Sequence, residues 1–333
     1  MVLSKKNQSQ IIRSHNLDIR WNLSAEEYLL ETVSQGKPIL FLWQSEDAVV
    51  IGKNQNLWKE CPNVLIEKDQ VSFARRISGG GAVFHDVGNL NYSFIAHRQD
   101  YDLDKQIKVI RKALNKIGLH FQMDSHYALT INKLKISGNA FRFSKHKALH
   151  HGTLLVSSNL EKLNYFLQNS LHDISSKGVK SRPAEVTNLS LINESITVNS
   201  LNTLIANSFC EEYGLSDCSI KEFPANNYNQ FKHIYEKHQS WEWLYGRTPQ
   251  FEMTLNPSFE WGSVKIVFFI KNGLVSQSQI ESEVLSIWIS KKISDVLNGL
   301  QFDSKKLSEA LNQIKSLDLK MSDLIRFMDR TLF

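Results

Sequence analysis

The densest set of chemically active residues in this sequence lies in residues 75–86, RRISGGGAVFHD. Consecutive glycines lack Cβ atoms, so their backbone N–H groups can converge on a single anionic group. Arg75 and Arg76 would add charge and planar donors suited to phosphate or carboxylate. The stretch is not a P-loop, because no Gly-Lys-Ser/Thr follows, and its glycine spacing excludes a dinucleotide fingerprint. Taken alone, such a stretch is more often a flexible connection with solvated arginines.

Lys135 is the second candidate, within the strand-like stretch LKISG. It alternates with Leu134 and Ile136, so its side chain points to the opposite face of a strand from theirs. One interpretation is a cation that reaches into a pocket against negative charge. The other is a lysine on the solvent face of a hairpin.

His150 and His151 form the third candidate, in the stretch HHGTLLV. Neighbouring residues on a strand point to opposite faces, so the pair is a poor joint metal site, and we predict no metal-ligating residues. One histidine of the pair can still line a pocket, and Gly152 allows close backbone approach.

The surrounding elements predict strands in hairpins interleaved with helices. Residues 22–33 are expected to form a helix with Ser24 as its cap and Glu27 in the capping-box position. Residues 106–119 show a helical apolar face. Strands are expected in these stretches, with the first two paired: 38–44, 47–52, 81–96, 128–138 and 150–158. Residues 81–96 are expected to form two paired strands with a turn at Asp86, Gly88 and Asn89, and residues 128–138 a hairpin that turns at Asn132 and Lys133. This order favours an α+β fold with a large mixed or antiparallel sheet.

The C-terminal part is expected to form a small α+β domain. Residues 210–240 have a weak pattern, and the polar stretch FPANNYNQFK, residues 223–232, is interpreted as a connector. A hairpin is expected with its turn at Asn272 and Gly273, followed by two helical patterns in residues 286–333. The predicted domains are residues 1–240, with a core of about 30–215, and residues 241–333.

The composition is that of an ordinary globular protein, with 42% hydrophobic and 22% charged residues and a net charge of +5. This charge does not indicate a nucleic-acid binder. Three scattered cysteines make a zinc site or a disulfide framework improbable. No signal peptide or membrane span is evident, so a cytoplasmic protein is expected. A monomer is the default expectation.

Three stretches in this order, RRISGGGAVFHDVGNLNYSF, KISGNAFR and HHGTLL, closely resemble the lipoate–protein ligase A family. The similarity continues in NLSAEEYLL, AVVIGKNQNLWKEC, VKSRPAEVTNL and QSWEWLYGRTPQF, and therefore covers nearly the whole chain. The resemblance implies the biotin/lipoate ligase catalytic fold with a small C-terminal domain. It also implies that lipoate is joined to AMP from ATP and then passed to a lysine of a lipoyl domain.

The resemblance assigns roles to individual residues. Lys135 would be the catalytic residue, placed between the lipoyl carbonyl and the α-phosphate. The residues implied for ATP binding are Arg76, Gly81, Ala82, Val83, Phe84 and Lys135. The residues implied for lipoate binding are Lys135, Arg75, Ser78, His85 and His151. Mg²⁺ would be held mainly through phosphates, with no prosthetic group. The implied acceptors are 2-oxoacid dehydrogenase E2 subunits and the glycine-cleavage carrier protein, with no nucleic acid or membrane partner.

The sequence departs from the family pattern at residues 125–128, SHYA, where Ala128 replaces an acidic residue. Alanine cannot hold a divalent cation. Three interpretations stay open: a tolerated substitution, a metal held by phosphates and water, or a lipoyltransferase that uses preformed lipoyl-AMP. A thioester-forming octanoyltransferase is disfavoured, because the cysteines lie outside the motifs. A non-catalytic protein that binds nucleotide or nucleic acid is also disfavoured, because the sequence contains no run of basic residues. The sequence does not rank lipoate against octanoate.

Overall fold

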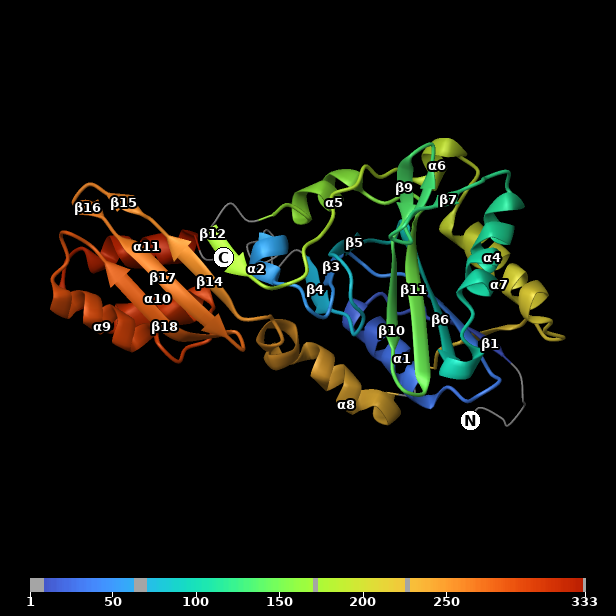
Figure 1. Ribbon diagram of the computed structural model, residues 1–333, viewed down its shortest axis with the longest axis horizontal. Helices are drawn as coiled ribbons and strands as arrows, with labels where there is room; N and C mark the ends of the chain where they lie inside the picture. Colours follow the sequence, from blue (N-terminus) through green and yellow to red (C-terminus); the bar gives the residue numbers. More distant parts are fainter. Residues whose placement is uncertain (1–8, 63–70, 170–172, 225–227, 332–333) are drawn as a thin grey trace.

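The computed structural model describes residues 9–62, 71–169, 173–224 and 228–331. Figure 1 shows two parts of the chain side by side. The larger part holds most of the first 220 residues, and the smaller holds the C-terminal sheet and its helices. Helix α8 (Tyr228–Gln239) leads from one part to the other. None of the described helices is long and apolar enough to cross a membrane.

A six-stranded mixed sheet forms the centre of the larger part, in the order β10-β11-β6-β2-β1-β13. Its strands are β1 (Gln10–Arg13), β2 (Ile39–Trp43), β6 (Asn89–His97), β10 (Asn139–Phe143), β11 (Lys147–Leu155) and β13 (Ile220–Glu222). The β2–β6, β6–β11 and β10–β11 pairs are antiparallel, whereas β1 pairs in parallel with β2 and β13. The predicted α+β fold with a mixed sheet is therefore confirmed.

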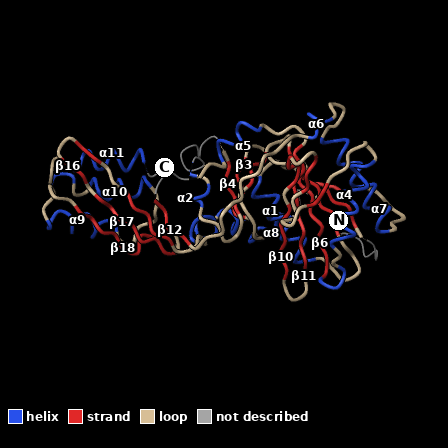
Figure 2. The backbone as a smooth tube through the Cα atoms, turned by 45° about the horizontal axis from the view of Figure 1, so that its top comes forward, coloured by secondary structure: helices blue, strands red, loops and turns tan. Residues whose placement is uncertain are grey.

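Both faces of this sheet are covered, which explains why β2 is an unbroken buried run. Leu40 and Leu42 pack into a core with helices α4 (Leu103–Asn115) and α7 (Val198–Tyr213). Ile39, Phe41 and Trp43 belong to a second core, which also contains residues of helix α1 (Ile19–Thr32). Alternate side chains of a strand point to opposite faces, so one apolar strand serves two cores. Figure 2 shows α4 and α7 beside the strands.

Two three-stranded sheets stand next to the main sheet. The first, in the order β4-β3-β5, contains β3 (Ala48–Ile51), β4 (Ser72–Arg75) and β5 (Val83–His85). The second, in the order β7-β8-β9, contains β7 (Gln122–Met123), β8 (Leu129–Ile131) and β9 (Leu134–Ser137). The turn predicted between β8 and β9 is confirmed, with positive φ values of 50° at Asn132 and 68° at Lys133.

Two sequence-based pairings are wrong. The runs 38–44 and 47–52 do form strands, but β2 lies in the main sheet and β3 pairs with β4 and β5. Both runs are buried on all sides, so their apolar pattern did not reveal their neighbours. The predicted strands within residues 81–96 also separate, because β5 joins β3 while β6 joins β2.

Helix α1 begins earlier than the sequence pattern predicted. Its N-cap is Asp18, whose carboxylate accepts hydrogen bonds from the backbone N–H groups of Arg20 and Trp21. The predicted cap, Ser24, lies inside the helix and donates to the Arg20 carbonyl. The capping prediction for Ser24 and Glu27 is therefore wrong. The shorter helices of the larger part are α2 (Leu57–Glu60), α5 (Leu160–Phe166) and α6 (Leu189–Ile192).

The smaller part is a four-stranded sheet, in the order β12-β14-β17-β18, with three helices. Its sheet strands are β12 (Asp173–Ser176), β14 (Phe251–Leu255), β17 (Lys265–Lys271) and β18 (Leu274–Glu281), and the short β15 (Ser258–Phe259) and β16 (Gly262–Ser263) pair separately. Its helices are α9 (Ile287–Leu297), α10 (Ser304–Asn312) and α11 (Met321–Thr331). The tail thus contains three α-helices where two were expected. The hairpin turn at Asn272 and Gly273 is confirmed.

Strand β12 complicates the predicted boundary between residues 240 and 241. It ends at Ser176, well before that boundary, yet it pairs with β14 of the smaller part. The boundary itself stays a prediction. The stretch 223–232 is not a plain connector, since α8 begins within it at Tyr228. Part of it, residues 225–227, lies outside the described residues.

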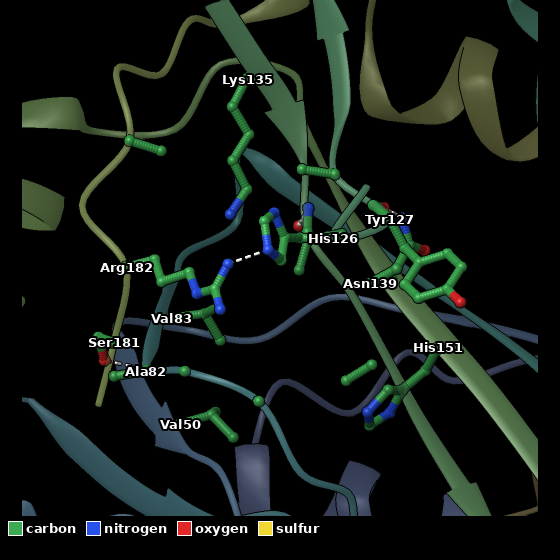
Figure 3. A pocket seen from close by; sticks show the side chains of 18 of the residues that line it. Val50, Ala82, Val83, His126, Tyr127, Lys135, Asn139, His151, Ser181 and Arg182 are labelled. Atoms are coloured by element: carbon green, nitrogen blue, oxygen red, sulfur yellow. Dashed lines mark hydrogen bonds between the residues drawn. The ribbon is translucent and has the colours of Figure 1, made fainter. Parts of the chain in front are cut away.

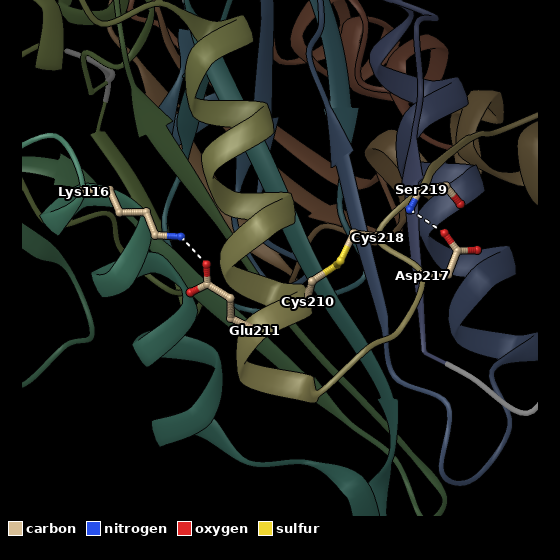
Figure 4. Close-up of a disulfide and its surroundings, with 6 residues drawn as sticks. All are labelled: Lys116, Cys210, Glu211, Asp217, Cys218 and Ser219. Atoms are coloured by element: carbon tan, nitrogen blue, oxygen red, sulfur yellow. Dashed lines mark hydrogen bonds and ion pairs between the residues drawn. A yellow bond between two sulfur atoms is a disulfide. The ribbon is translucent and has the colours of Figure 1, made fainter.

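A disulfide joins Cys210 of α7 to Cys218, contrary to the sequence-based expectation (Figure 4). Helix α7 ends at Gly214, whose φ of 63° turns the chain back toward β13. This turn brings the two Cα atoms to 5.7 Å. The separation of eight residues carried no signal for such a contact. Cys61 is buried and free.

Helix α1 is held against α8 through the buried carboxylate of Glu27. His238 Nε2 lies 2.8 Å from its Oε2, and Lys237 Nζ bonds its other oxygen. Burial by itself would raise the pKa of Glu27. The hydrogen bonds and charges of His238 and Lys237 outweigh burial and lower this pKa from 4.5 to about 2. A carboxyl with a depressed pKa stabilises the fold above its unfolded pKa and loses that contribution as pH falls.

We expect Glu27→Gln to lower the free energy of unfolding at pH 7 by about 3 kcal/mol, the equivalent of this pKa shift. The difference from wild type should shrink as pH falls from 4.5 toward 2. Urea unfolding across this pH range measures it, with the exposed Glu161→Gln as a control. Parallel stability curves for wild type and Glu27→Gln would contradict the assignment.

Candidate functional site

A single cavity of about 820 Å³ brings most of the predicted site residues together (Figure 3). Its wall combines residues of the small sheets, of β10 and β11, and of the segment 179–185. One end, here called the inner end, is lined by buried side chains: Leu23, Trp43, Val50, His85, Asn91, Ser93 and His151. The other, here called the outer end, is lined by exposed side chains: Ser125, His126, Lys133, Lys180 and Arg182.

Lys135 extends from β9 into the cavity, where Figure 3 shows its ammonium group near Arg182 and His126. Its backbone N–H donates to the Glu185 carbonyl at 2.8 Å, and Thr187 N–H donates back to the Lys135 carbonyl at 3.0 Å. These bonds fix the strand against the segment that follows residue 184. Burial lowers the pKa of Lys135, the nearby Asp124 raises it, and Arg76 lowers it further. The net shift is downward, and the group is a half-buried cation facing a cavity.

The glycine loop, residues 79–81, is shaped by Arg76. The Arg76 guanidinium donates to three backbone carbonyls, those of Val50 at 3.1 Å, Gly79 at 2.6 Å and Gly81 at 2.7 Å. Its charge is thus held by the loop itself, although the side chain also forms part of the cavity wall. Arg76 therefore acts first on the shape of the loop.

Two close contacts explain why glycine is needed here. Gly80 has a φ of +91°, and a Cβ at this position would lie 2.8 Å from Arg76 Nη2. A Cβ on Gly52, at the end of β3, would lie 2.2 Å from the Gly80 carbonyl oxygen. Residues with a side chain rarely adopt the φ of Gly80, and neither glycine position leaves room for a Cβ atom. The loop can therefore lie flat against β3 and contribute backbone to the cavity.

A buried hydrogen-bonded chain ties this loop to helix α1. Arg76 Nε donates to Ser78 Oγ at 3.0 Å, and Ser78 Oγ lies 2.7 Å from His151 Nε2. His151 Nδ1 lies 2.9 Å from Glu26 Oε1, and Ser93 Oγ donates to the same carboxylate. Glu26 is fully buried, and its charge raises the pKa of Arg76 against the lowering by burial. We call this the Glu26 chain.

The structure places the predicted residues in two groups. Those that line the cavity are Arg76, Gly81, Ala82, Val83, His85, Lys135 and His151. Three others lie behind its wall. Phe84 stacks on Phe166 with ring centroids 5.8 Å apart, and Ser78 is buried beneath His151. The predicted contact between Arg75 and lipoate is not supported, because its guanidinium is buried among backbone carbonyls of residues 52–55 and 243–244.

Sequence reasoning missed several residues of the cavity wall. Ser181 bridges the wall, since its Oγ accepts from the backbone N–H of Ala82 at 3.0 Å and from Gln55 at 2.9 Å. Arg182 contacts His126 at the outer end. The stretch KSRPAE is part of the family resemblance, but the sequence gives no sign of this contact, because Ser181 lies 99 residues after Ala82.

Ala128 lies beside the carboxylate of Asp124. Asp124 lines the cavity, and its Oδ1 accepts the backbone N–H groups of His126 and Ala128, each at 2.8 Å. A carboxylate therefore stands four residues before Ala128 and close enough to act on the charge of Lys135. No group of three or more potential metal ligands occurs in the part of the chain that the structure describes.

Comparison with known proteins finds the same family over both parts of the chain. Residues 18–210 match the lipoyl protein ligase A/B catalytic domain, and residues 248–327 match the bacterial lipoate protein ligase C-terminus. The lipoate-protein ligase A of Blochmanniella floridana is 36% identical over 292 residues, covering 85% of this chain and 86% of that protein.

Solved structures have the same fold. Plasmodium falciparum LipL1 in complex with lipoate has a TM-score of 0.63 and 28% identity, covering 96% of this chain and 99% of that one. A lipoate-protein ligase A bound with ATP has a TM-score of 0.60 and 22% identity, covering 71% of this chain and 98% of that one. The latter likeness concerns the fold alone.

Proposed function

This chain belongs to the lipoate–protein ligase A family, and we propose that it joins lipoate to AMP from ATP and then transfers the lipoyl group to a lysine of an acceptor protein. The observation that carries the proposal is the cavity lined by Lys135, which combines a buried inner end with a basic outer end, where Figure 3 shows Lys135 near Arg182. An apolar acid with one carboxylate suits the inner end. A nucleotide suits the outer end, where Lys133, Lys180 and Arg182 gather.

In the first step, a lipoate carboxylate oxygen attacks the α-phosphorus of ATP, and the bond to pyrophosphate breaks. Both reactants are anions, so cations and backbone donors must offset their repulsion. Lys135 supplies a compact charge that stabilises the negative charge developing on the phosphoryl oxygens. The glycine loop gives the nucleotide close access to backbone. Relatives of the same fold hold lipoate in one case and ATP in another, which supports this assignment of substrates.

Mg²⁺ usually binds through one or two carboxylates together with substrate phosphates and water. The residues present fit this pattern, since Asp124 and Glu185 both line the cavity. We propose that Asp124 supports an ion held mainly by the ATP phosphates. Mg²⁺ would neutralise phosphate charge and help pyrophosphate to leave.

In the second step, the neutral amine of the acceptor lysine attacks the lipoyl carbonyl carbon. The bond from that carbon to the AMP oxygen breaks, the amine loses a proton, and AMP leaves. The enzyme has only to orient an already activated anhydride and keep water away. Ser78, His151 and Glu26 are hydrogen-bonded in series, as the serine, histidine and carboxylate of a catalytic triad are. However, Ser78 is buried behind the cavity wall and accepts a hydrogen bond from Arg76. We therefore assign it no covalent role.

Lipoate-dependent exchange of labelled pyrophosphate into ATP tests the activation step without any acceptor. We expect exchange that requires lipoate and Mg²⁺ together. Absence of exchange, with acceptor modification only from synthetic lipoyl-AMP, would contradict the proposal and support a lipoyltransferase.

Asp124→Asn should separate the two steps. We expect pyrophosphate exchange to fall by about tenfold or more at limiting Mg²⁺, the effect typical of losing a supporting carboxylate. Transfer from preformed lipoyl-AMP should change far less, because it needs no ATP phosphates. The exposed Asp104→Asn on α4 makes the same change away from the cavity and serves as the control. Equal losses in both steps would contradict the role of Asp124.

A further inference from the structure

Four cations lie together on the surface outside the cavity, and we call them the basic stripe: Lys53, Arg142, Arg247 and Lys271. Burial, followed by the charges of Arg142 and Arg247, lowers the pKa of Lys53, so these three cations are close enough to repel one another. Arg247 and Lys271 line a hollow of about 260 Å³, together with Asn54. The stripe therefore connects cations of the larger part to Lys271 of the smaller part.

The charge of the basic stripe is not neutralised from within the described part of the chain. No carboxylate of the described residues forms an ion pair with any of the four cations. The carboxylate of Glu27 acts on Lys53 through its charge, but Lys237 and His238 already pair with this carboxylate. Both cations of the hollow are exposed, and the other two are half-buried. The stripe therefore keeps its charge available to a partner outside this chain.

One end of the basic stripe borders the turn that leads into the glycine loop. The backbone N–H of Lys53 donates to the Ser78 carbonyl at 2.8 Å, and Arg142 Nη1 donates to the Ile77 carbonyl at 3.0 Å. Arg142 also lies two residues after Ala140 on the same face of β10, and Ala140 lines the cavity. A partner held on the stripe would therefore lie beside the cavity that is proposed to form lipoyl-AMP.

The extent of the basic stripe indicates what kind of partner it fits. It runs from β10 in the larger part to the end of β17 in the smaller part (Figure 1). A small anion would contact only a fraction of this surface, whereas a protein can contact all of it. Of the substrates in the proposed reaction, only the acceptor is a protein, and its lysine must enter the cavity that the stripe borders.

We propose that the basic stripe is the docking surface for the acceptor protein, and that it selects a lysine flanked by carboxylates. The inference rests on the proposed function, in which the acceptor lysine must reach the lipoyl carbonyl. A lysine in solution is a cation, so the stripe repels it unless neighbouring carboxylates pair with the stripe. After docking, the same positive charges disfavour the ammonium form of the incoming lysine and thus favour the neutral amine that attacks.

Transfer from synthetic lipoyl-AMP by the full-length enzyme tests docking without the activation step. The acceptor is a purified apo-lipoyl domain with carboxylates beside its acceptor lysine. Arg247→Glu combined with Lys271→Glu should raise the KM for this domain by about tenfold or more and leave kcat within about twofold, because steering acts on the encounter. Arg247→Lys combined with Lys271→Arg keeps both charges and should keep the wild-type KM. Lys291→Glu combined with Lys315→Glu, at exposed positions of the smaller part, makes the same change in net charge and is the control.

Two further measurements separate docking from a general loss of structure. Neutralising the carboxylates beside the acceptor lysine should raise the wild-type KM as well, but should add little to the KM of the Arg247→Glu, Lys271→Glu enzyme, because the two changes remove the same interaction. About 0.5 M NaCl should bring the KM values of wild type and this variant together, since salt screens exposed charges.

The outcomes separate the inference from the proposed function. An unchanged KM in the Arg247→Glu, Lys271→Glu enzyme would overturn the inference alone, because wild type still transfers the lipoyl group. The same holds if this variant keeps its KM but loses affinity for single-stranded DNA, since the stripe would then serve nucleic acid. An equal rise of KM in the control would also overturn it. If wild type transfers nothing, the proposed function fails and the inference with it. Thermal unfolding reports whether each variant is folded, and Lys53→Glu carries the test if the double variant is not.

Discussion

Lys135→Ala is expected to lower the rate of acceptor modification by about 10²–10³-fold, the effect of removing one charged donor from a developing oxyanion. The affinities for lipoate and ATP should change much less. The reason is that the negative charge near Lys135 grows as pyrophosphate leaves, so the ammonium group stabilises the transition state more than the bound substrates. The change removes no buried apolar contact that the core requires, since Lys135 is half-buried and faces the cavity.

Single-turnover rates together with calorimetric affinities measure this split. Lys145→Ala, on the exposed turn after β10, removes the same charge away from the cavity and should keep the wild-type rate. Because burial lowers the pKa of Lys135 below 10.5, the ammonium is lost at a lower pH than for a free lysine. The activation rate should therefore decline as pH rises through this lowered pKa. A Lys135→Ala enzyme with a near-normal rate would refute the catalytic role.

Arg75→Ala is expected to lower the free energy of unfolding by about 3–5 kcal/mol, the range for disrupting a buried charged network. The Arg75 guanidinium is fully buried, and its bonds are almost all to backbone carbonyls. These acceptors are the carbonyls of Gly52, Lys53, Gln55, Trp243 and Leu244, together with Thr248 Oγ1. Alanine would leave several of these buried acceptors unpaired, and each unpaired group costs about 1–3 kcal/mol before relaxation.

The position of Arg75 also predicts how the protein unfolds. Its partners lie on both sides of the predicted boundary at residue 240, and Trp243 Nε1 donates back to the Arg75 carbonyl at 2.7 Å. We expect wild type to unfold in urea as one transition and Arg75→Ala to separate the two parts. Arg326→Ala, on the exposed face of α11, should change stability by less than about 0.5 kcal/mol. A loss below about 1 kcal/mol for Arg75→Ala would contradict this account.

The sequence allowed correct inferences where the signal was local. The turns at Asn132 and Asn272 were predictable because asparagine tolerates positive φ and stands between alternating strands. Family likeness pointed to Lys135 and His151, which the structure brings to one cavity. It implied a ligand contact for both neighbouring arginines, Arg76 with ATP and Arg75 with lipoate. Only Arg76 reaches the cavity, because the side chains of adjacent residues point in opposite directions.

The remaining features depend on contacts between distant segments. Glu26 lies 125 residues from His151, and Ser181 lies 99 residues from Ala82. No periodicity or spacing records such pairs. The same reason explains the wrong pairing of β2 with β3 and the missed strand β12, which joins a sheet formed mostly by residues after 250.

The central claim is that this one protein both activates lipoate and transfers it. Mass spectrometry of a purified apo-lipoyl domain tests it most directly, after incubation with the enzyme, lipoate and Mg²⁺, with and without ATP. We predict one lipoyl group on one acceptor lysine, formed only when ATP is present, and formed without ATP when lipoyl-AMP replaces lipoate. Modification from lipoyl-AMP alone, with none from lipoate and ATP, would contradict the claim.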